Sequence, residues 1–240
     1  MHKKRTPVNT WKPFQESPVV RPAIVPRQRG PETTPHQAAT MSPTLPLESS
    51  RLRIRPLRRQ DLDERQRWTP FNDPLHLIWD MPACSQREND NWFNLMTDRR
   101  RRLTYGVEDL NGRLVGMISL RDISWGRSAR LGIALSSDHV GQGYGTECLQ
   151  LLLPYFFLSL KFRKMVLDVA AANLRAVRCY RRLGFQRTGS HWHAVDGPLD
   201  PQLFESPVHA ALRRFFRWRW GRAEALYYDM ELRQEEWGQT

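Results

Sequence analysis

A glycine-rich turn, Val140-Gly-Gln-Gly-Tyr-Gly-Thr146, joins two segments of different character. The apolar run Leu131–Leu135 before it is typical of a strand, and residues 144–160 after it carry the apolar pattern of a helix. A turn from a strand into a helix leaves backbone N–H groups unpaired at the positive end of the helix, and such groups attract a phosphate. Glycine allows the close approach and the positive φ angles that this requires. The turn predicts a phosphate-binding loop, with a purely structural turn as the alternative.

The same stretch excludes two common nucleotide-binding motifs. A Walker loop ends in Gly-Lys-Ser/Thr, whereas this one ends in Gly145-Thr146. A dinucleotide-binding fold has its glycine-rich turn after the first strand of the domain, whereas several predicted strands precede Val140. We therefore expect neither nucleotide hydrolysis nor NAD chemistry.

The segments on both sides of the turn predict a mixed sheet with helices on its faces, an α/β (α+β) architecture. Asn111-Gly112 supplies the positive φ of a tight hairpin turn, and Pro154 removes a backbone hydrogen bond, which predicts a kink in the long helix. The predicted strands are residues 52–56, 103–107, 114–120, 131–135, 165–169, 185–192 and 227–232, and the predicted helices are residues 59–68, 86–99, 144–160 and 173–183.

Three motifs follow one another along the chain, namely Leu131-Gly-Ile-Ala-Leu135, Gly141-Gln-Gly-Tyr-Gly-Thr-Glu147 and Asn173-Leu-Arg-Ala-Val-Arg-Cys-Tyr-Arg-Arg-Leu-Gly-Phe185. At this spacing they resemble the acetyl-CoA-binding core of the GNAT superfamily of N-acetyltransferases, and most of all its subgroup of ribosomal-protein N-terminal and polyamine acetyltransferases. The resemblance runs from Leu52 to about Gly197 and resumes in the last predicted strand. It implies the GNAT acyl-CoA N-acyltransferase fold, with acetyl-CoA as the acetyl donor.

The resemblance also implies where acetyl-CoA binds. Two neighbouring parallel strands, one ending near Leu135 and the next starting at Met165, would part in a V-shaped opening that holds the pantetheine arm. Asn173 would hold this arm as well, and the glycine-rich turn would cradle the pyrophosphate. The implied cofactor-binding residues are Ile133, Ala134, Leu135, Val140, Gly141, Gln142, Gly143, Tyr144, Gly145, Thr146, Asn173 and Tyr180.

Tyr180 is the implied catalytic residue, because its hydroxyl would protonate the leaving thiolate. It follows Asn173 by two helical turns, so both side chains lie on one face of the helix. The alternative for Tyr180 is a core aromatic packed under a short helix. Two departures from the family pattern concern charge: Val140 replaces the usual Arg or Gln at the start of the loop, and Arg130 replaces an acidic residue before Leu131. A carboxylate base on that strand is not expected, and no base is assigned.

Composition narrows the class of protein further. The chain has 37 Lys and Arg against 25 Asp and Glu, for a formal net charge of +12. Its three cysteines, Cys84, Cys148 and Cys179, form neither a disulfide framework nor a zinc motif, which favours a reducing, cytoplasmic setting.

His191 and His193 alternate on one strand and could relay a proton or bind a metal. Strand histidines without further ligands are more often structural, so no metal is assigned.

No membrane span or secretion signal is expected. The longest nearly apolar run, Leu149–Leu160, is interrupted by polar residues and is shorter than the roughly 20 residues that a bilayer requires. The basic N-terminus, Met1–Arg5, is followed by polar residues instead of an apolar signal core.

The composition of residues 1–47 predicts a disordered, basic, Pro-rich tail. They hold nine of the 17 prolines, and seven Lys or Arg against two Glu, without a periodic apolar pattern that could offset the entropy of ordering. The tail is either a contact arm for acidic surfaces or a solvated segment without a partner, and Met41 leaves the natural start of the chain open. Residues 48–240 form the predicted acetyltransferase domain.

An insertion, residues 198–224, separates the last two predicted strands, where members of the family have a short loop. Its segment Leu212–Trp220 holds four arginines and four aromatic residues. The segment predicts an amphipathic helix whose Phe215 and Trp218 cover the domain while its arginines stay solvated, or else a surface that grips nucleic acid or an anionic membrane. In the proteins that this one resembles, the loops of the last two strands border the substrate side, so the resemblance also implies that the insertion borders the acceptor end of the opening.

These features predict an N-acetyltransferase that moves an acetyl group from acetyl-CoA to a primary amine. The acceptor in this prediction is a protein or peptide N-terminus or a small-molecule amine, which attacks acetyl-CoA directly in a ternary complex. The alternative is a GNAT-fold binding module that docks on RNA, the ribosome or an anionic membrane through its basic tail and its Arg/Trp insertion.

Overall fold

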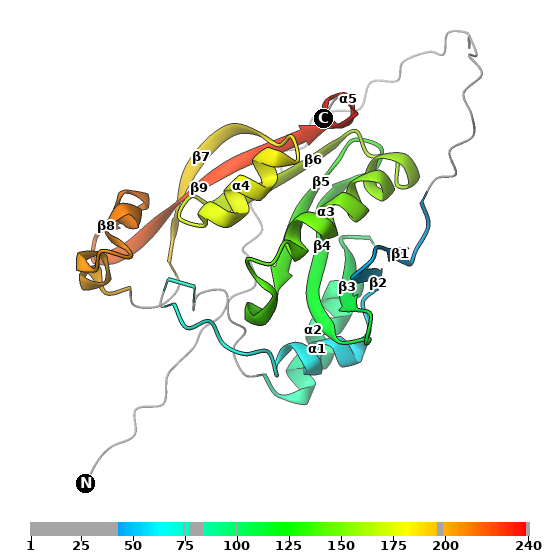
Figure 1. Cartoon of the computed structure of the whole chain (residues 1–240), viewed down its shortest axis with the longest axis horizontal. Helices are drawn as coiled ribbons and strands as arrows, with labels where there is room; N and C mark the ends of the chain where they lie inside the picture. The colour runs from blue at the N-terminus through cyan, green and yellow to red at the C-terminus, as the bar shows by residue number, and fades with distance from the viewer. Residues whose placement is uncertain (1–42, 74, 77–83, 99, 196–198, 239–240) are drawn as a thin grey trace. The chain divides into compact units, whose positions relative to one another are not determined.

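Figure 1 shows the fold as a computed structural model, in which residues 43–73, 75–76, 84–98, 100–195 and 199–238 are described. Within these residues a sheet of nine strands has the order β1-β2-β3-β4-β5-β6-β9-β7, with β8 paired to β9. The strands are β1 Leu47–Glu48, β2 Leu52–Pro56, β3 Leu103–Asp109, β4 Leu114–Ser124, β5 Ser128–Leu135, β6 Lys164–Ala170, β7 Gln186–Ala194, β8 Phe216–Arg219 and β9 Arg222–Arg233. Every neighbouring pair is antiparallel except β5 and β6, which run parallel.

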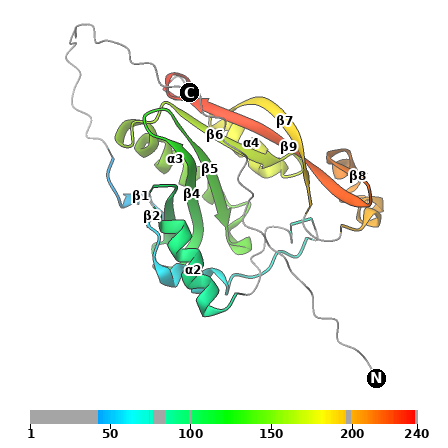
Figure 2. The same cartoon turned by 180° about the vertical axis from the view of Figure 1, so that it is seen from behind.

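Helices cover both faces of this sheet, so the predicted α/β mixed sheet is confirmed. They are α1 Arg59–Arg65, α2 Gln86–Thr97, α3 Tyr144–Pro154, the π-helical turn η3 Tyr155–Ser159, α4 Leu174–Arg182, α5 Gln234–Trp237 and the 3₁₀ turns η2 Ser137–His139, η4 Pro201–Glu205 and η5 Ala210–Phe215. Leu114 and Met117 of β4 pack in one cluster with residues of α1 and α2, whereas Val115 and Ile118 pack in the main core with residues of α3. In Figure 1 α3 and α4 lie in front of the strands, and in Figure 2, seen from behind, α2 does.

Strands β5 and β6 pair over only three residues. Their register joins Ser128 to Lys164 and ends where Arg130 meets Val166. Beyond that point β5 stays paired with β4 as far as Leu135, and β6 stays paired with β9 as far as Ala170, so the two strands part while their outer edges remain in the sheet. Figure 1 shows this divergence. It is the V-shaped opening that the sequence predicts.

The long predicted helix changes type at Pro154 instead of only bending there. After Pro154 the chain forms the π-helical turn η3, in which the N–H of Leu160 donates to the carbonyl of Tyr155, five residues earlier, at 2.9 Å. Proline has no N–H for the α-helical bond and crowds the preceding turn, and a π turn is one way in which a helix accommodates such a break. No helix in the described part of the chain has both the length and the apolar content of a membrane span.

The prediction of an amphipathic helix within Leu212–Trp220 is wrong. The segment passes from the 3₁₀ turn η5 into strand β8, which forms a hairpin with β9 through Trp220 and Gly221, both at positive φ. Arginine and aromatic residues alternate along β8, so the aromatic side chains face one side, as in a strand. Phe215 is buried, as predicted, and packs in a second core cluster.

Two arginines of the insertion contact other residues of the insertion or of β7. Arg217 forms an ion pair with Glu224, its cross-strand neighbour, and its guanidinium lies 4.3 Å from the ring centre of Trp192. Arg213 donates to the carbonyl of Phe216 at 2.8 Å and lies 4.5 Å from the ring centre of Trp218. The prediction that the arginines stay solvated is therefore wrong for Arg217, which is partly buried in this ion pair, whereas Arg213 and Arg214 are exposed, as predicted.

The boundary predicted at residue 47 also requires correction. Leu47 is 5% exposed, lies in the main core and pairs with Ile54. Leu45 packs against the same core, and the carbonyl of Pro43 accepts a hydrogen bond from Ser159. Residues 43–47 thus belong to the domain, because apolar side chains at two of these positions fill its core. Residues 1–42, the rest of the predicted tail, lie outside the described residues.

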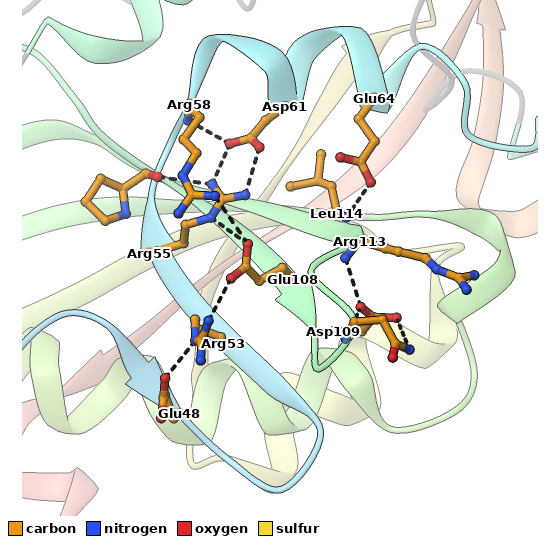
Figure 3. Close-up of polar contacts among 12 residues, drawn as sticks. Glu48, Arg53, Arg55, Arg58, Asp61, Glu64, Glu108, Asp109, Arg113 and Leu114 are labelled. Atoms are coloured by element: carbon orange, nitrogen blue, oxygen red, sulfur yellow. Dashed lines mark hydrogen bonds and ion pairs between the residues drawn. The ribbon is translucent and has the colours of Figure 1, made fainter.

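A buried charge network joins β2, α1 and β3 (Figure 3). Arg55, 5% exposed, donates from Nη1 and Nη2 to the two carboxylate oxygens of Asp61 at 2.6 and 2.8 Å, and from Nε to Glu108 at 2.7 Å. Asp61 also accepts from the backbone N–H of Arg58 at 2.6 Å, which fixes the first turn of α1. A Cβ added to Gly106 would lie 2.6 Å from Nη1 of Arg55, so only glycine leaves room for the guanidinium. The network fixes α1 against the first strands of the sheet.

Replacing Asp61 by Ala should lower the free energy of unfolding by about 3–5 kcal/mol, because it leaves the buried Arg55 guanidinium without its bidentate partner. Urea unfolding followed by circular dichroism measures the change. The matched control is Glu48→Ala, which removes a half-exposed partner of Arg53 and should leave the unfolding midpoint nearly unchanged. Equal midpoints for the two variants would contradict this account of the network.

Candidate active site

The opening between β5 and β6 brings together the sequence-predicted site residues. At one wall, a Cβ added to Gly145 would lie 3.5 Å from Cδ1 of Leu135, so the first turn of α3 lies directly against the end of β5. At the other wall, α4 starts directly after β6, with the N–H of Asn173 donating to the carbonyl of Ala170. Thr146 of α3 and Cys179 of α4 are in contact, with 3.2 Å between Oγ1 and Sγ. The two helices and the two strands therefore frame one site.

The glycine-rich turn has the backbone conformation that the sequence predicts for it. Gly141 has a φ of 79° and Gly143 a φ of 86°, values at which a β-carbon is strained. Gly143 is the N-cap of α3, and its lack of a side chain leaves the first N–H groups of this helix without a side-chain cap. Unpaired N–H groups at the positive end of a helix form an anion site.

Arg51, in the turn between β1 and β2, holds this loop in place. Its Nη1 donates to the carbonyl of Gln142 at 3.3 Å, and its Nε donates to Glu147 at 2.8 Å. The same guanidinium lies 4.5 Å from the ring centre of Tyr144, where a cation is attracted to the aromatic face. Ser49 adds a 2.6 Å hydrogen bond to Glu147. Sequence analysis missed Arg51, because it lies 91 residues from Gln142 and carries no local signal.

The charge of Glu147 depends on these contacts. Burial tends to raise the pKa of its carboxyl group, but the hydrogen bonds from Ser49 and Arg51 and the positive charge of Arg51 outweigh burial and lower the pKa. Glu147 is therefore ionised at neutral pH and orients Arg51 toward the loop.

A second arginine that sequence analysis missed lies on the other side of the loop. A Cβ added to Gly141 would lie 3.9 Å from Nη1 of Arg175, an exposed residue in the first turn of α4. Val140 provides no charge where the family pattern has Arg or Gln. Both arginines thus lie beside the turn, Arg51 near Gly143 and paired with Glu147, and Arg175 near Gly141.

Asn173 has a structural role beside the one that the resemblance implies. It is the N-cap of α4, and its Oδ1 accepts from the N–H of Ala176 at 3.1 Å. This leaves its Nδ2 as a donor near the opening. Ile133, Ala134 and Leu135 pair with β4 on one side only, because their register with β6 ends at Arg130. The backbone groups of these β5 residues that face the opening therefore have no strand partner there.

Tyr180 lies in the main core beside the site. It is 7% exposed, and its ring packs edge-on against Phe185 at 5.6 Å between centres. Burial raises the pKa of its hydroxyl strongly, and nearby Cys179 and Asp168 raise it further. The phenol therefore stays protonated throughout the physiological pH range. This environment fits a packed core aromatic, and the raised pKa makes the phenol a weak acid, so the catalytic role of Tyr180 stays a prediction.

Arg130 neutralises the carboxylate of the neighbouring strand. Its Nη1 donates to Asp168 of β6 at 3.0 Å and its Nε to Asp122 at 2.8 Å, and Arg121 lies 3.4 Å from the same oxygen of Asp168. Asp168 is thus held in ion pairs on both sides. Asp168 is therefore a paired carboxylate of β6, and the residues of β5 carry no carboxylate.

His191 and His193 have partners on β9. His191 lies 3.2 Å from a carboxylate oxygen of Asp229 and stacks on Tyr227, and His193 packs edge-on against the same ring, each at 5.8 Å between ring centres. In the part of the chain that the structure describes, no group of three His, Cys, Asp or Glu residues could hold a metal ion.

Comparison with known proteins identifies the family. Residues 51–186 match the acetyltransferase (GNAT) domain. The chain belongs to the GNAT acetyltransferases. A spermidine N(1)-acetyltransferase of Vibrio cholerae serotype O1 is 28% identical over 142 residues, which cover 59% of this chain and 82% of that enzyme. An aminoglycoside N(6′)-acetyltransferase type 1 of Klebsiella pneumoniae is 30% identical over 79 residues, 33% of this chain and 37% of that enzyme.

Solved structures share the fold of this GNAT acetyltransferase. The crystal structure of a Vibrio cholerae spermidine N-acetyltransferase in complex with CoA and spermine superposes with a TM-score of 0.58 at 23% identity, over 79% of this chain and 99% of that one. The predictions of family, GNAT fold, enzyme class and donor are confirmed: the protein is an acyltransferase that uses acetyl-CoA. The individual site residues stay predictions.

Replacing Arg175 by Gln should raise the Kd for acetyl-CoA by about 10-fold, because a charged hydrogen-bond donor beside the pyrophosphate loop is lost. Isothermal titration calorimetry measures this affinity. Arg178→Gln, one turn further along the exposed side of α4, is the matched control with the same loss of net charge. The effect of Arg175→Gln should shrink in 0.5 M salt. An equal loss of affinity in the control variant would show that only net charge matters.

Proposed function

We propose that this GNAT acetyltransferase transfers the acetyl group of acetyl-CoA to a primary amine, either the N-terminus of a protein or peptide or a small-molecule amine. The parting of β5 and β6 after Arg130 carries the proposal, because it leaves strand backbone groups exposed to an opening that ends at the glycine-rich turn. A pantetheine arm has amide groups that can pair with such a strand, and a pyrophosphate matches the unpaired N–H groups of the turn.

The proposal keeps the cofactor-binding residues that the resemblance implies, and the geometry of the opening supports them. Backbone groups of Ile133, Ala134 and Leu135 pair with the pantetheine, and Val140–Thr146 enclose the pyrophosphate. The Nδ2 of Asn173 donates to the pantetheine from the opposite wall. Arg51 and Arg175 add the side-chain charges that Val140 does not provide.

The reaction proceeds by direct attack in a ternary complex. The nitrogen of the neutral amine attacks the thioester carbonyl, and the oxygen becomes an oxyanion that an exposed N–H of β5 stabilises. The C–S bond then breaks, the C–N bond is kept, and the amine loses its proton to solvent. In this step Tyr180 donates its hydroxyl proton to the leaving thiolate. The proton is present at every physiological pH, but burial raises the pKa and so makes the phenol a weaker acid than in water.

In this proposal no carboxylate of β5 or β6 takes the proton of the amine, so the acceptor must bind as the neutral amine. Arg130 occupies the position before Leu131, and Asp168 is held by Arg130 and Arg121. Acceptors with a low amine pKa are therefore favoured. An α-amino group, with a pKa of about 8, is roughly one-tenth neutral at pH 7, whereas an alkylamine with a pKa of about 10.4 is almost fully charged.

Tyr180→Phe should lower kcat by roughly 10- to 1000-fold and leave the Kd for acetyl-CoA nearly unchanged, because the change removes the proton and keeps the ring. Release of free thiol from acetyl-CoA with a panel of amines measures turnover, and calorimetry measures binding. Tyr155→Phe, a tyrosine packed against the same core, is the matched control and should keep full activity. An unchanged kcat in Tyr180→Phe would assign the ring to packing alone.

A further inference from the structure

The hairpin of β8 and β9 ends in an exposed tryptophan. Trp220 and Gly221 form its two-residue turn, and the side chain of Trp220 is 91% exposed. In Figure 1 this turn lies at the end of β9 that is remote from α5. Phe216 and Trp218 of the same hairpin pack in the second core cluster, whereas Trp220 contributes almost no packing to the domain.

The backbone of this turn does not favour tryptophan. Trp220 has a φ of 45° and Gly221 a φ of 71°. Two-residue hairpin turns with positive φ at both positions favour Asn-Gly, because bulky side chains are strained in this region. Trp220 therefore neither fills the core nor stabilises the turn. Strained residues gather at binding sites, so this one indicates a contact with another molecule.

The residues on both sides of the turn are arginines that oppose each other. Arg219 and Arg222 are cross-strand neighbours, both exposed, and neither forms an ion pair within the described part of the chain. Like charges directly opposite each other destabilise an antiparallel pair. Residues 206–223 hold five arginines and no Asp or Glu. The turn thus carries two positive charges without a carboxylate, and an anion bound between them would relieve their repulsion.

Arg219 also contacts the exposed tryptophan. Its guanidinium lies 4.9 Å from the ring centre of Trp220, where a cation is attracted to the aromatic face. This contact covers at most one face of the indole, so the other face is accessible for stacking. An exposed aromatic ring between cations is an arrangement by which proteins bind unpaired nucleotides, because the ring stacks on a base while the cations contact phosphates.

We propose that the β8–β9 hairpin binds single-stranded nucleic acid, with one base stacked on Trp220 and neighbouring phosphates bound by Arg219 and Arg222. A guanidinium suits a phosphate because it donates two parallel hydrogen bonds to it. The site requires an unpaired base, since the bases of a duplex are already stacked on one another. This interaction lies outside the proposed acetyl transfer and does not depend on it.

Two other partners fit the turn less well. Docking on a membrane requires an apolar face, or a basic segment of roughly four to eight cations, whereas this turn exposes one aromatic side chain between two arginines. A second copy of the chain has the same net charge of +12, which opposes association through a cationic surface.

Fluorescence anisotropy with the full chain tests the stacking. The probes are a labelled RNA of about ten nucleotides, a DNA of the same sequence and a blunt duplex of that DNA. Trp220→Asn should raise the Kd for both single strands by at least ~5-fold, because it removes the stacking of one base, and should leave the Kd for the duplex nearly unchanged. The urea unfolding midpoint should not fall, since asparagine before glycine favours this turn.

The two single strands distinguish the sources of this ligand. Equal affinity for RNA and DNA would show that base and phosphate contacts suffice. Tighter binding of the RNA would identify an additional contact to its 2′-hydroxyl groups.

The chain offers a matched control in a second Trp-Gly-Arg turn, residues 125–127 between β4 and β5. Trp125 stacks on Phe162 at 5.4 Å between ring centres and is only 56% exposed, so it has a packing role within the domain. Trp125→Asn should leave the Kd for the single strands unchanged.

The dependence of binding on salt tests the phosphate contacts. Arg222→Gln should reduce the slope of log Kd against log salt concentration by about 0.7, because one phosphate contact to a single strand is lost. Arg127→Gln, the equivalent change in the control turn, should leave this slope unchanged. Equal slopes for the two variants would contradict a phosphate contact at Arg222.

The remaining outcomes separate the possible partners. Equal affinity of Trp220→Asn and the parent chain for the single strands, or an equal loss in Trp125→Asn, would overturn the proposal. If Trp220→Asn instead loses only cosedimentation with phosphatidylserine vesicles, or only a dimer seen by analytical ultracentrifugation, the turn binds a membrane or a second copy. A parent chain that binds no acetyl-CoA would overturn the proposed function and leave the nucleic-acid site in place.

Discussion

The domain is organised around the point after Arg130 at which β5 and β6 stop pairing. Each strand keeps its outer partner, β4 or β9, so the sheet stays continuous on both sides of the gap. Backbone groups that face the gap still require hydrogen-bond partners, and a ligand with amide groups can supply them. The glycine-rich turn lies at one end of this gap, and α4 lies along one wall.

The arginines of the domain differ in how far their charge is neutralised by neighbouring carboxylates. The net charge of +12 suggests a molecule covered by free cations, but Arg55, Arg130 and Arg217 are each held in ion pairs with carboxylates. Arg51, beside the glycine-rich turn, is likewise paired, with Glu147, whereas Arg175 lies near Gly141 of the same turn, where an anionic cofactor would meet it. The contribution of an arginine to binding therefore depends on its carboxylate neighbours more than on the total charge of the chain.

The strands and the glycine-rich turn follow from local patterns, and for that reason the sequence predicts them. Apolar periodicity and positive-φ glycines depend on neighbours a few residues away. Arg51 and Arg175 escaped prediction because they reach the turn through the tertiary fold. The helix predicted in the insertion was wrong for a different reason. The density of arginine and aromatic residues suggested a helix, but the residues alternate with period two, a strand pattern, in Phe216-Arg217-Trp218-Arg219. Spacing was the better guide than composition there. The end of the tail was misplaced because two isolated leucines, Leu45 and Leu47, form no periodic run.

The contact between Arg51 and Gln142 links the turn between β1 and β2 to the glycine-rich turn. Arg51 lies four residues after Leu47, so one guanidinium connects the beginning of the domain to residues 140–146. A ligand that immobilises the loop also restrains this turn. Amide hydrogen exchange at residues 49–52 should therefore slow when a ligand binds at the glycine-rich turn. The exchange rate at the beginning of the domain then measures binding at that turn.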